Sequence, residues 1–127
     1  MNHSLKIFTY AKIFVGMQFK RNPLPLELDC SLFTQMVFAK FGIKLPRTSR
    51  DQAKKGFDVN KNDLRPGDLI FFHIPDRNPA SGSVGHVAIY ANKQKMVHCL
   101  PTSNVFLTDM NLPYWKNKYL FAKRILK

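Results

Sequence analysis

Three side chains have the types that nucleophilic chemistry needs: a cysteine, Cys30, and two histidines, His86 and His98. Cys30 stands between Asp29 and Ser31, directly before an apolar run with helical spacing, so the sequence predicts a thiol at a helix start. A helix N-terminus stabilises a thiolate and donates hydrogen bonds to a developing oxyanion. Taken alone, the stretch from Asp29 to Ser31 more often marks a small buried cysteine at a helix start.

A thiol nucleophile needs a base that accepts its proton and a third group that orients the base. His86 and His98 lie in neighbouring apolar segments that we interpret as the two strands of one hairpin. An odd loop centred on Asn92 places the two histidines directly opposite each other, whereas an even loop places Cys99 opposite His86. Each histidine alone could equally be a hydrogen-bonded strand residue without a chemical role.

A zinc site is the main alternative, because His73, His86, His98 and Cys99 are all potential ligands. Structural zinc sites usually pair ligands two to four residues apart, and adjacent residues on a strand point to opposite faces. We therefore predict no metal site and no cofactor, and interpret Cys99 as a small buried residue behind His98.

The elements that must position these residues follow a simple order, with helices first and antiparallel hairpins second. This order predicts an α+β domain, with N-terminal helices packed on a central antiparallel sheet. Helices are expected over 4–15, from Cys30 to a C-cap at Gly42, and in a short segment where Ser49 and Gln52 form a capping box. A turn is expected over 65–68, strands over 69–72, 86–90, 96–99, 104–108 and 119–126, a helical turn over 112–115, and loops over 16–28 and 74–85.

Composition limits the class of protein. A chain of 127 residues fits one domain over 1–127, and no apolar run approaches the roughly 18 residues that would span a bilayer. The formal net charge of +12 favours an anionic partner. No nucleic-acid-binding signature appears, so nucleic acid is not the expected partner. The first 22 residues are not expected to act as an ordinary export signal, since Lys12 interrupts the apolar segment and no small-residue cleavage site follows.

In these motifs the chain resembles the NlpC-type, papain-like cysteine peptidases that act on bacterial cell walls. The matching segments are 29–31 (Asp-Cys-Ser), 45–49 (Leu-Pro-Arg-Thr-Ser), 66–72 (Pro-Gly-Asp-Leu-Ile-Phe-Phe), 85–90 (Gly-His-Val-Ala-Ile-Tyr) and 97–98 (Val-His). Within that family, 111–116 (Asn-Leu-Pro-Tyr-Trp-Lys) and 124–126 (Arg-Ile-Leu) are similar to the Spr-like murein endopeptidases.

The resemblance implies a Cys-His-His triad, in which Cys30 is the nucleophile, His86 the general base and acid, and His98 the group that orients His86. It also implies substrate contacts at Asp29, Ser31, Arg47 and Ser49. Three of them have a structural alternative: Asp29 as a helix cap, Arg47 as a solvated charge and Ser49 as part of a capping box.

The chain departs from the family pattern before the nucleophile, where members carry a Tyr-x-x-Gly-Gly stretch. Alignment on Gly16 puts Ile13 at the tyrosine position, and Tyr10 lies one helical turn earlier. Either Tyr10 substitutes for that hydroxyl through a shifted helix, or the site lacks it. The longer 18–28 loop is expected to reshape one wall of the cleft.

The family resemblance implies hydrolysis of an amide next to a D-amino acid, either between D-glutamate and a diamino acid or in a D-alanine to diaminopimelate cross-link. The expected partner is a peptidoglycan stem peptide, and the protein is expected to be a monomer acting in the periplasm or cell wall. Export by a specialised route suggests an antibacterial (type VI) amidase effector with an immunity protein, or a phage enzyme, while a trimmed signal is the plain alternative. A papain-like acyltransferase and a catalytically silent wall-binding module are the rival functions.

Overall fold

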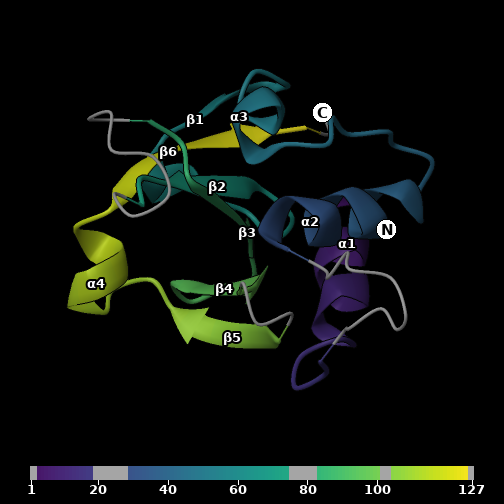
Figure 1. Ribbon diagram of the computed structural model, residues 1–127, viewed down its shortest axis with the longest axis horizontal. Helices are drawn as coiled ribbons and strands as arrows, with labels where there is room; N and C mark the ends of the chain where they lie inside the picture. Colours follow the sequence, from purple (N-terminus) through teal and green to yellow (C-terminus); the bar gives the residue numbers. More distant parts are fainter. Residues whose placement is uncertain (1–2, 19–28, 75–82, 101–103, 126–127) are drawn as a thin grey trace.

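The computed structural model describes residues 3–18, 29–74, 83–100 and 104–125. It confirms the predicted α+β class and the order of helices before hairpins (Figure 1). The elements are α1 (His3–Lys12), α2 (Cys30–Ala39), α3 (Ser49–Gln52), β1 (Phe57–Val59), a 3-10 turn (Lys61–Asp63), β2 (Leu69–Phe72), β3 (His86–Tyr90), β4 (Lys95–Cys99), β5 (Val105–Asp109), α4 (Pro113–Lys116) and β6 (Tyr119–Arg124). Most of the predicted loops over 16–28 and 74–85 lies outside the described residues, namely 19–28 and 75–82.

The six strands form one antiparallel sheet in the order β1-β6-β2-β3-β4-β5. Helices α1 and α2 cover one side of it, while α4 lies on the other side (Figure 1). The helix side holds the larger core, in which Phe33 and Phe38 of α2 pack against Val87 and Ile89 of β3. The prediction of N-terminal helices packed on a central sheet is confirmed.

The middle strands are buried on both faces, which explains their nearly continuous apolar runs. Odd-numbered residues of β3 and β4 face α1 and α2, and even-numbered residues face a second core built around Met110 and Trp115. His86 and His98 have even numbers and Cys99 has an odd number, so the two histidines lie on the face opposite to Cys99.

The hairpin between β3 and β4 has its centre one residue later than predicted. Lys93 and Gln94 both take positive φ, and the Lys95 N–H donates to Asn92 O in a tight turn. Ile89 therefore lies opposite Val97. The expected direct opposition of His86 and His98 is wrong: the register shifts by two residues, which keeps both rings on one face in a diagonal pair.

Two further local predictions need correction. Thr48, not Ser49, caps α3, because its side chain accepts the Asp51 N–H at 3.1 Å. Gln52 turns into the core instead of closing a capping box. Helix α2 ends at Ala39, and Gly42 then turns the chain with φ of +79°.

Strand β1 and the 3-10 turn carry no sequence signal that we identified. A side chain on Gly56, just before β1, would meet the backbone of Arg124, since its Cβ would lie 2.3 Å from Arg124 O. Close approach of β1 to β6 therefore depends on glycine at this position.

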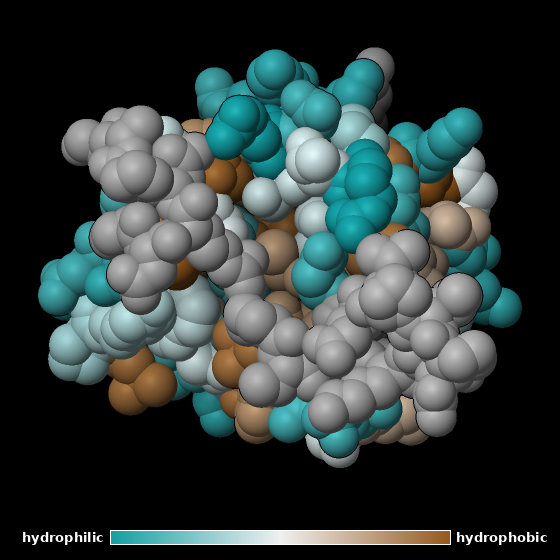
Figure 2. All heavy atoms as spheres, in the orientation of Figure 1, coloured by the Kyte–Doolittle hydropathy of each residue, from teal (hydrophilic) through white to brown (hydrophobic). Residues whose placement is uncertain are grey.

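Hydrophilic side chains cover much of the described surface in Figure 2, with smaller hydrophobic areas between them. Among the described residues, none of the helices has the length and apolar character needed to cross a membrane.

Candidate active site

Cys30 is the first residue of α2, and Asp29 caps that helix. The Leu32 N–H donates to Asp29 Oδ1 at 2.8 Å, and the Phe33 N–H donates to Asp29 O at 2.9 Å. These two bonds fix the first turn and confirm the predicted helix start. Cys30 is only 3% exposed, so its thiol lies where the helix N-terminus acts with little screening by water.

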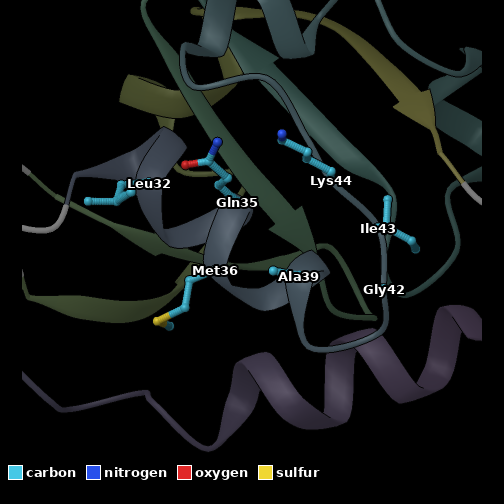
Figure 3. Close-up of a pocket in the computed structure, with 7 residues that line it drawn as sticks. All are labelled: Leu32, Gln35, Met36, Ala39, Gly42, Ile43 and Lys44. Carbon is cyan, nitrogen blue, oxygen red and sulfur yellow. The ribbon is translucent and has the colours of Figure 1, made fainter.

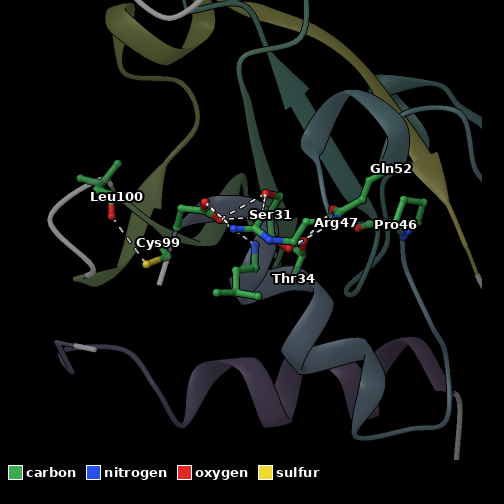
Figure 4. A network of polar contacts seen from close by, with 9 residues as sticks. Ser31, Thr34, Pro46, Arg47, Gln52, Cys99 and Leu100 are labelled. Carbon is green, nitrogen blue, oxygen red and sulfur yellow. Dashed lines mark hydrogen bonds and ion pairs between the residues drawn. The ribbon is translucent and has the colours of Figure 1, made fainter. Parts of the chain in front are cut away.

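Arg47 reaches the same helix start from the loop before α3 (Figure 4). Its Nη2 lies 3.1 Å from Asp29 Oδ2 and its Nη1 donates to Ser31 Oγ at 3.0 Å, while Ser31 Oγ donates to Asp29 Oδ1 at 3.2 Å. Burial disfavours the charge on Asp29, but the hydrogen bonds from Leu32 and Arg47 outweigh it and lower the pKa of the carboxyl. Three of the four predicted substrate contacts therefore form one network beside the thiol.

Gln52 holds the loop that carries Arg47. It is fully buried, and its Nε2 donates to Ser31 O at 3.0 Å and to Pro46 O at 2.9 Å. Thr34 Oγ1 donates to Gln52 Oε1 at 2.6 Å. Ser49, the fourth predicted contact, begins α3 in the same loop region, and its backbone oxygen accepts the Ala53 N–H.

The two histidines contact each other through their rings. His86 Nε2 lies 2.9 Å from His98 Nδ1, and the second nitrogen of His98, Nε2, lies 2.8 Å from Thr108 Oγ1 on β5. The Trp115 ring packs on both, with centroids 5.2 Å from His86 and 5.1 Å from His98. Burial lowers the pKa of His98 to about 4, so this ring is neutral near pH 7.

The helix start and the two histidines lie toward the same end of the sheet. Strand β3 begins at His86 and its antiparallel neighbour β4 ends at Cys99, so both residues lie at the same end. Cys30 and Cys99 belong to the same buried cluster, so the start of α2 lies beside the end of β4. Burial, followed by the charges of Cys30 and Asp29, raises the pKa of Cys99 to about 12. Cys30 comes to this end from the helix side, and the histidines come from the other side.

Tyr10 is not brought to this end. Its ring makes edge contacts with Phe14 and Phe41, at 5.1 and 5.8 Å between centroids, and the Lys40 ammonium lies 5.7 Å from its centroid. Lys40 and Phe41 follow the C-terminal end of α2, and a helix of ten residues is about 15 Å long. The structure therefore does not support the shift that would let Tyr10 replace the family tyrosine.

His73, weighed above as a zinc ligand, has its Nδ1 at 2.8 Å from Ser83 O. In the part of the chain that the structure describes, no three histidine, cysteine or acidic side chains come together as a metal-binding group.

An apolar groove of about 400 Å³ follows the outer face of α2 (Figure 3). Leu32, Gln35 and Met36 form its helix side, and Ile43 and Lys44 line it from the chain that follows α2. The groove is distinct from the two histidines, which do not line it.

Sequence reasoning missed Thr108, Trp115 and Gln52 as parts of the site. Thr108 and Trp115 are far from the cysteine in sequence, and only the pairing of β5 with β4 and the packing of α4 bring them to the histidines. His98 and Thr108 both have even numbers, which could have indicated a shared face once the register between β4 and β5 was known.

The chain belongs to the NlpC/P60 family, whose model matches residues 15–124. It is 41% identical over 101 residues to the Escherichia coli murein DD-endopeptidase MepS/murein LD-carboxypeptidase, covering 78% of this chain and 50% of that protein. It is 37% identical over 117 residues to a Bacillus cereus gamma-D-glutamyl-L-lysine dipeptidyl-peptidase, covering 91% of this chain and 34% of that protein. The crystal structure of an NlpC/P60 family protein from Bacillus cereus matches with a TM-score of 0.82 and 32% identity, over 98% of this chain and 40% of the other. This chain thus spans half or less of the length of these relatives.

Proposed function

We propose that this chain is a cysteine peptidase that hydrolyses amide bonds in peptidoglycan stem peptides or their cross-links. The observation that carries the proposal is the bonded pair of His86 and His98 at the end of the sheet where α2 begins with Cys30. Membership of the NlpC/P60 family supports the substrate class, as do relatives named as murein and glutamyl-lysine peptidases.

In the proposed reaction, His86 Nδ1 takes the proton of the Cys30 thiol, and the thiolate attacks the carbonyl carbon of the amide. N–H groups in the first turn of α2 stabilise the oxyanion. When the C–N bond breaks, His86 returns the proton to the leaving amine. Water deprotonated by His86 then hydrolyses the thioester, which releases the acid and restores the thiol.

His98 suits the orienting role in this reaction. Its Nδ1 lies 2.9 Å from His86 Nε2, and by accepting a hydrogen bond from that nitrogen it would direct His86 Nδ1 to the proton transfer. Because burial lowers the pKa of His98 to about 4, the neutral ring does not repel an imidazolium at His86.

Asp29, Ser31, Arg47 and Ser49 form the proposed subsite for charged groups beside the scissile bond. The side chains of Arg47 and Asp29 are 45% and 41% exposed, so a substrate can reach both charged heads. Stem peptides carry carboxylates and amines that such a pair can bind. Tyr10 is left out of this subsite because it packs at the far end of α2.

Action in the periplasm or cell wall follows from this substrate and is part of the proposal. An effector role with an immunity protein is a separate hypothesis, motivated by the basic composition and the substrate class. Its test is expression in the periplasm of a bacterial host together with candidate partner genes. Toxicity that no partner relieves would count against it.

The decisive experiment is mass spectrometry of defined muropeptides after incubation with the wild type, with Cys30→Ala and with Cys99→Ala. Cys99→Ala is the matched control, because it removes the other buried thiol. Cleavage by the wild type and Cys99→Ala but not by Cys30→Ala is the expected result. A cross-linked dimer and a monomer with an intact D-glutamyl bond, supplied separately, identify the bond that is cut.

The rival functions give different products. Intact muropeptides with all three proteins would refute the peptidase proposal. In that case, transfer of an acyl group to an added amine would point to an acyltransferase, and salt-dependent binding that survives Cys30→Ala would point to a wall-binding module.

A further inference from the structure

Thr108 stands at the end of a line of polar groups that crosses three strands. In the sheet, Thr108 lies opposite Met96 and His98 lies opposite Phe106, so Thr108 is the diagonal neighbour of His98 on the same face. His86 is the diagonal neighbour of His98 on the other side, as the hairpin register requires. The two contacts, 2.9 Å from His86 to His98 and 2.8 Å from His98 to Thr108, are both short enough for well-formed hydrogen bonds.

The direction of these two bonds decides which nitrogen of His86 can act as the base. A neutral His98 carries one proton, on Nδ1 or on Nε2. With the proton on Nδ1, His98 donates to His86 Nε2, and a neutral His86 then holds its proton on Nδ1. That nitrogen can then no longer accept the thiol proton. With the proton on His98 Nε2, His86 Nε2 donates instead, and its Nδ1 carries the lone pair.

We propose that Thr108 is a positioning residue, whose hydroxyl accepts the Nε2–H of His98 and so keeps His98 in the tautomer that leaves His86 Nδ1 basic. The inference rests on the proposed function, in which His86 is the base. A threonine hydroxyl can also donate, but His86 as an imidazolium carries protons on both nitrogens. A proton on His98 Nδ1 would then face the proton on His86 Nε2, so the proposed transfer of the Cys30 proton to His86 favours the form in which Thr108 accepts.

Packing holds the two histidine rings in place. The Trp115 ring lies at an interplanar angle of 34° to His86 and 90° to His98, so it covers one ring and abuts the other. Phe72 packs against both Trp115 and His86, with ring centroids 5.0 and 6.1 Å away. These contacts limit ring rotation, but they do not distinguish the two nitrogens of His98. A hydrogen-bond acceptor is needed for that choice, and Thr108 supplies one.

The test compares Thr108→Val, Thr108→Ser and the wild type. Valine keeps the shape and suits a strand, and serine keeps the hydroxyl. Long-range proton-nitrogen NMR of labelled protein reports the tautomer of each histidine, and muropeptide kinetics report kcat and KM. Thr9→Val is the matched control, because it removes a hydroxyl that donates to Leu5 O at an exposed position of α1, on the other side of the sheet from the histidines.

For the wild type and Thr108→Ser, we expect His98 to be protonated on Nε2. For Thr108→Val, we expect mixed tautomers at His98 and a roughly tenfold lower kcat with KM unchanged, because one hydrogen bond is lost and no substrate contact changes. An unchanged His98 tautomer in Thr108→Val would overturn the inference, as would a kcat equal to that of the wild type.

Failure of the proposed function gives a different result. A wild type that cleaves no muropeptide refutes the peptidase proposal, whatever Thr108 does. The NMR comparison does not depend on turnover, so the hydrogen bond from His98 to Thr108 is confirmed or refuted in either case.

Discussion

His86 and His98 meet diagonally across two neighbouring strands, and their hydrogen bond joins one nearly buried ring to another. A buried neutral histidine makes folding depend on pH. Its pKa is about 4 in the folded protein against 6.5 when exposed, so the unfolded chain binds the proton first as the pH falls. The stabilisation that His98 contributes as a neutral ring is therefore complete above about pH 6.5 and is lost progressively toward pH 4.

We predict that the free energy of unfolding of the wild type falls by about 2 kcal/mol more than that of His98→Gln between pH 7 and pH 5. Glutamine keeps a carbonyl acceptor for His86 but does not titrate. Urea denaturation at both pH values measures the difference, and His73→Gln serves as the control. Equal pH dependence of the wild type and His98→Gln would contradict a neutral buried His98.

The two cysteines should react very differently with iodoacetamide. Since burial and nearby negative charge raise the pKa of Cys99 to about 12, only about one in ten thousand of its thiols is ionised at pH 8. We predict a single alkylation, at Cys30, in the native protein, none in Cys30→Ala, and two in urea. Peptide mapping locates the modified residue, and rapid native alkylation of Cys99 would show that the prediction is wrong.

Arg47 should matter for substrate binding more than for the chemical step. In Arg47→Lys the charge stays, but the planar fork that contacts Asp29 and Ser31 is lost. We expect KM for a muropeptide to rise roughly tenfold with kcat nearly unchanged. Arg50→Lys, at an exposed position in α3, is the control. If KM does not change in Arg47→Lys, Arg47 does not belong to the subsite.

Patterns of neighbouring residues predicted most of this fold and much of the candidate site. The helix start at Cys30 and the turn before β2 have strong local signals: a cap at Asp29, and Gly67 with φ of +97°. The relation between His86 and His98 could be predicted only as far as a shared face, because moving the hairpin centre by one residue shifts the register by two and leaves the face unchanged.

The rest depends on contacts that are distant in sequence. Gln52 matches the spacing of a capping box, but it is buried because Thr34 and two backbone carbonyls offer it stronger partners. Strand β1 is three residues long and exists by pairing with β6. Nothing in a pattern of neighbouring residues encodes either contact.

Asp68 and Arg124 should contribute strongly to stability. Asp68 is 1% exposed and accepts two hydrogen bonds from Arg124, at 2.9 Å each, which tie the end of β6 to the turn before β2. Asp68→Ala leaves the largely buried guanidinium without its carboxylate, and we expect a loss of about 3 kcal/mol in the free energy of unfolding. Asp51→Ala, which breaks an exposed pair with Lys54, should change it by less than about 0.5 kcal/mol. Comparable losses in the two variants would contradict the prediction.

The β3–β4 turn offers a stabilising change. Gln94 has φ of +64°, a left-handed conformation that costs a residue with a side chain about 1 kcal/mol. The Gln94 N–H donates to Tyr90 Oη, and the Gln94 carbonyl accepts the Met110 N–H. Because both hydrogen bonds use the backbone, glycine can keep them. We expect Gln94→Gly to raise the free energy of unfolding by about 0.5 kcal/mol, after the entropic cost of glycine is subtracted. Asn92→Gly, in the same turn but without a positive φ, should lower it, and urea denaturation of the pair at one pH decides whether backbone strain is stored at Gln94.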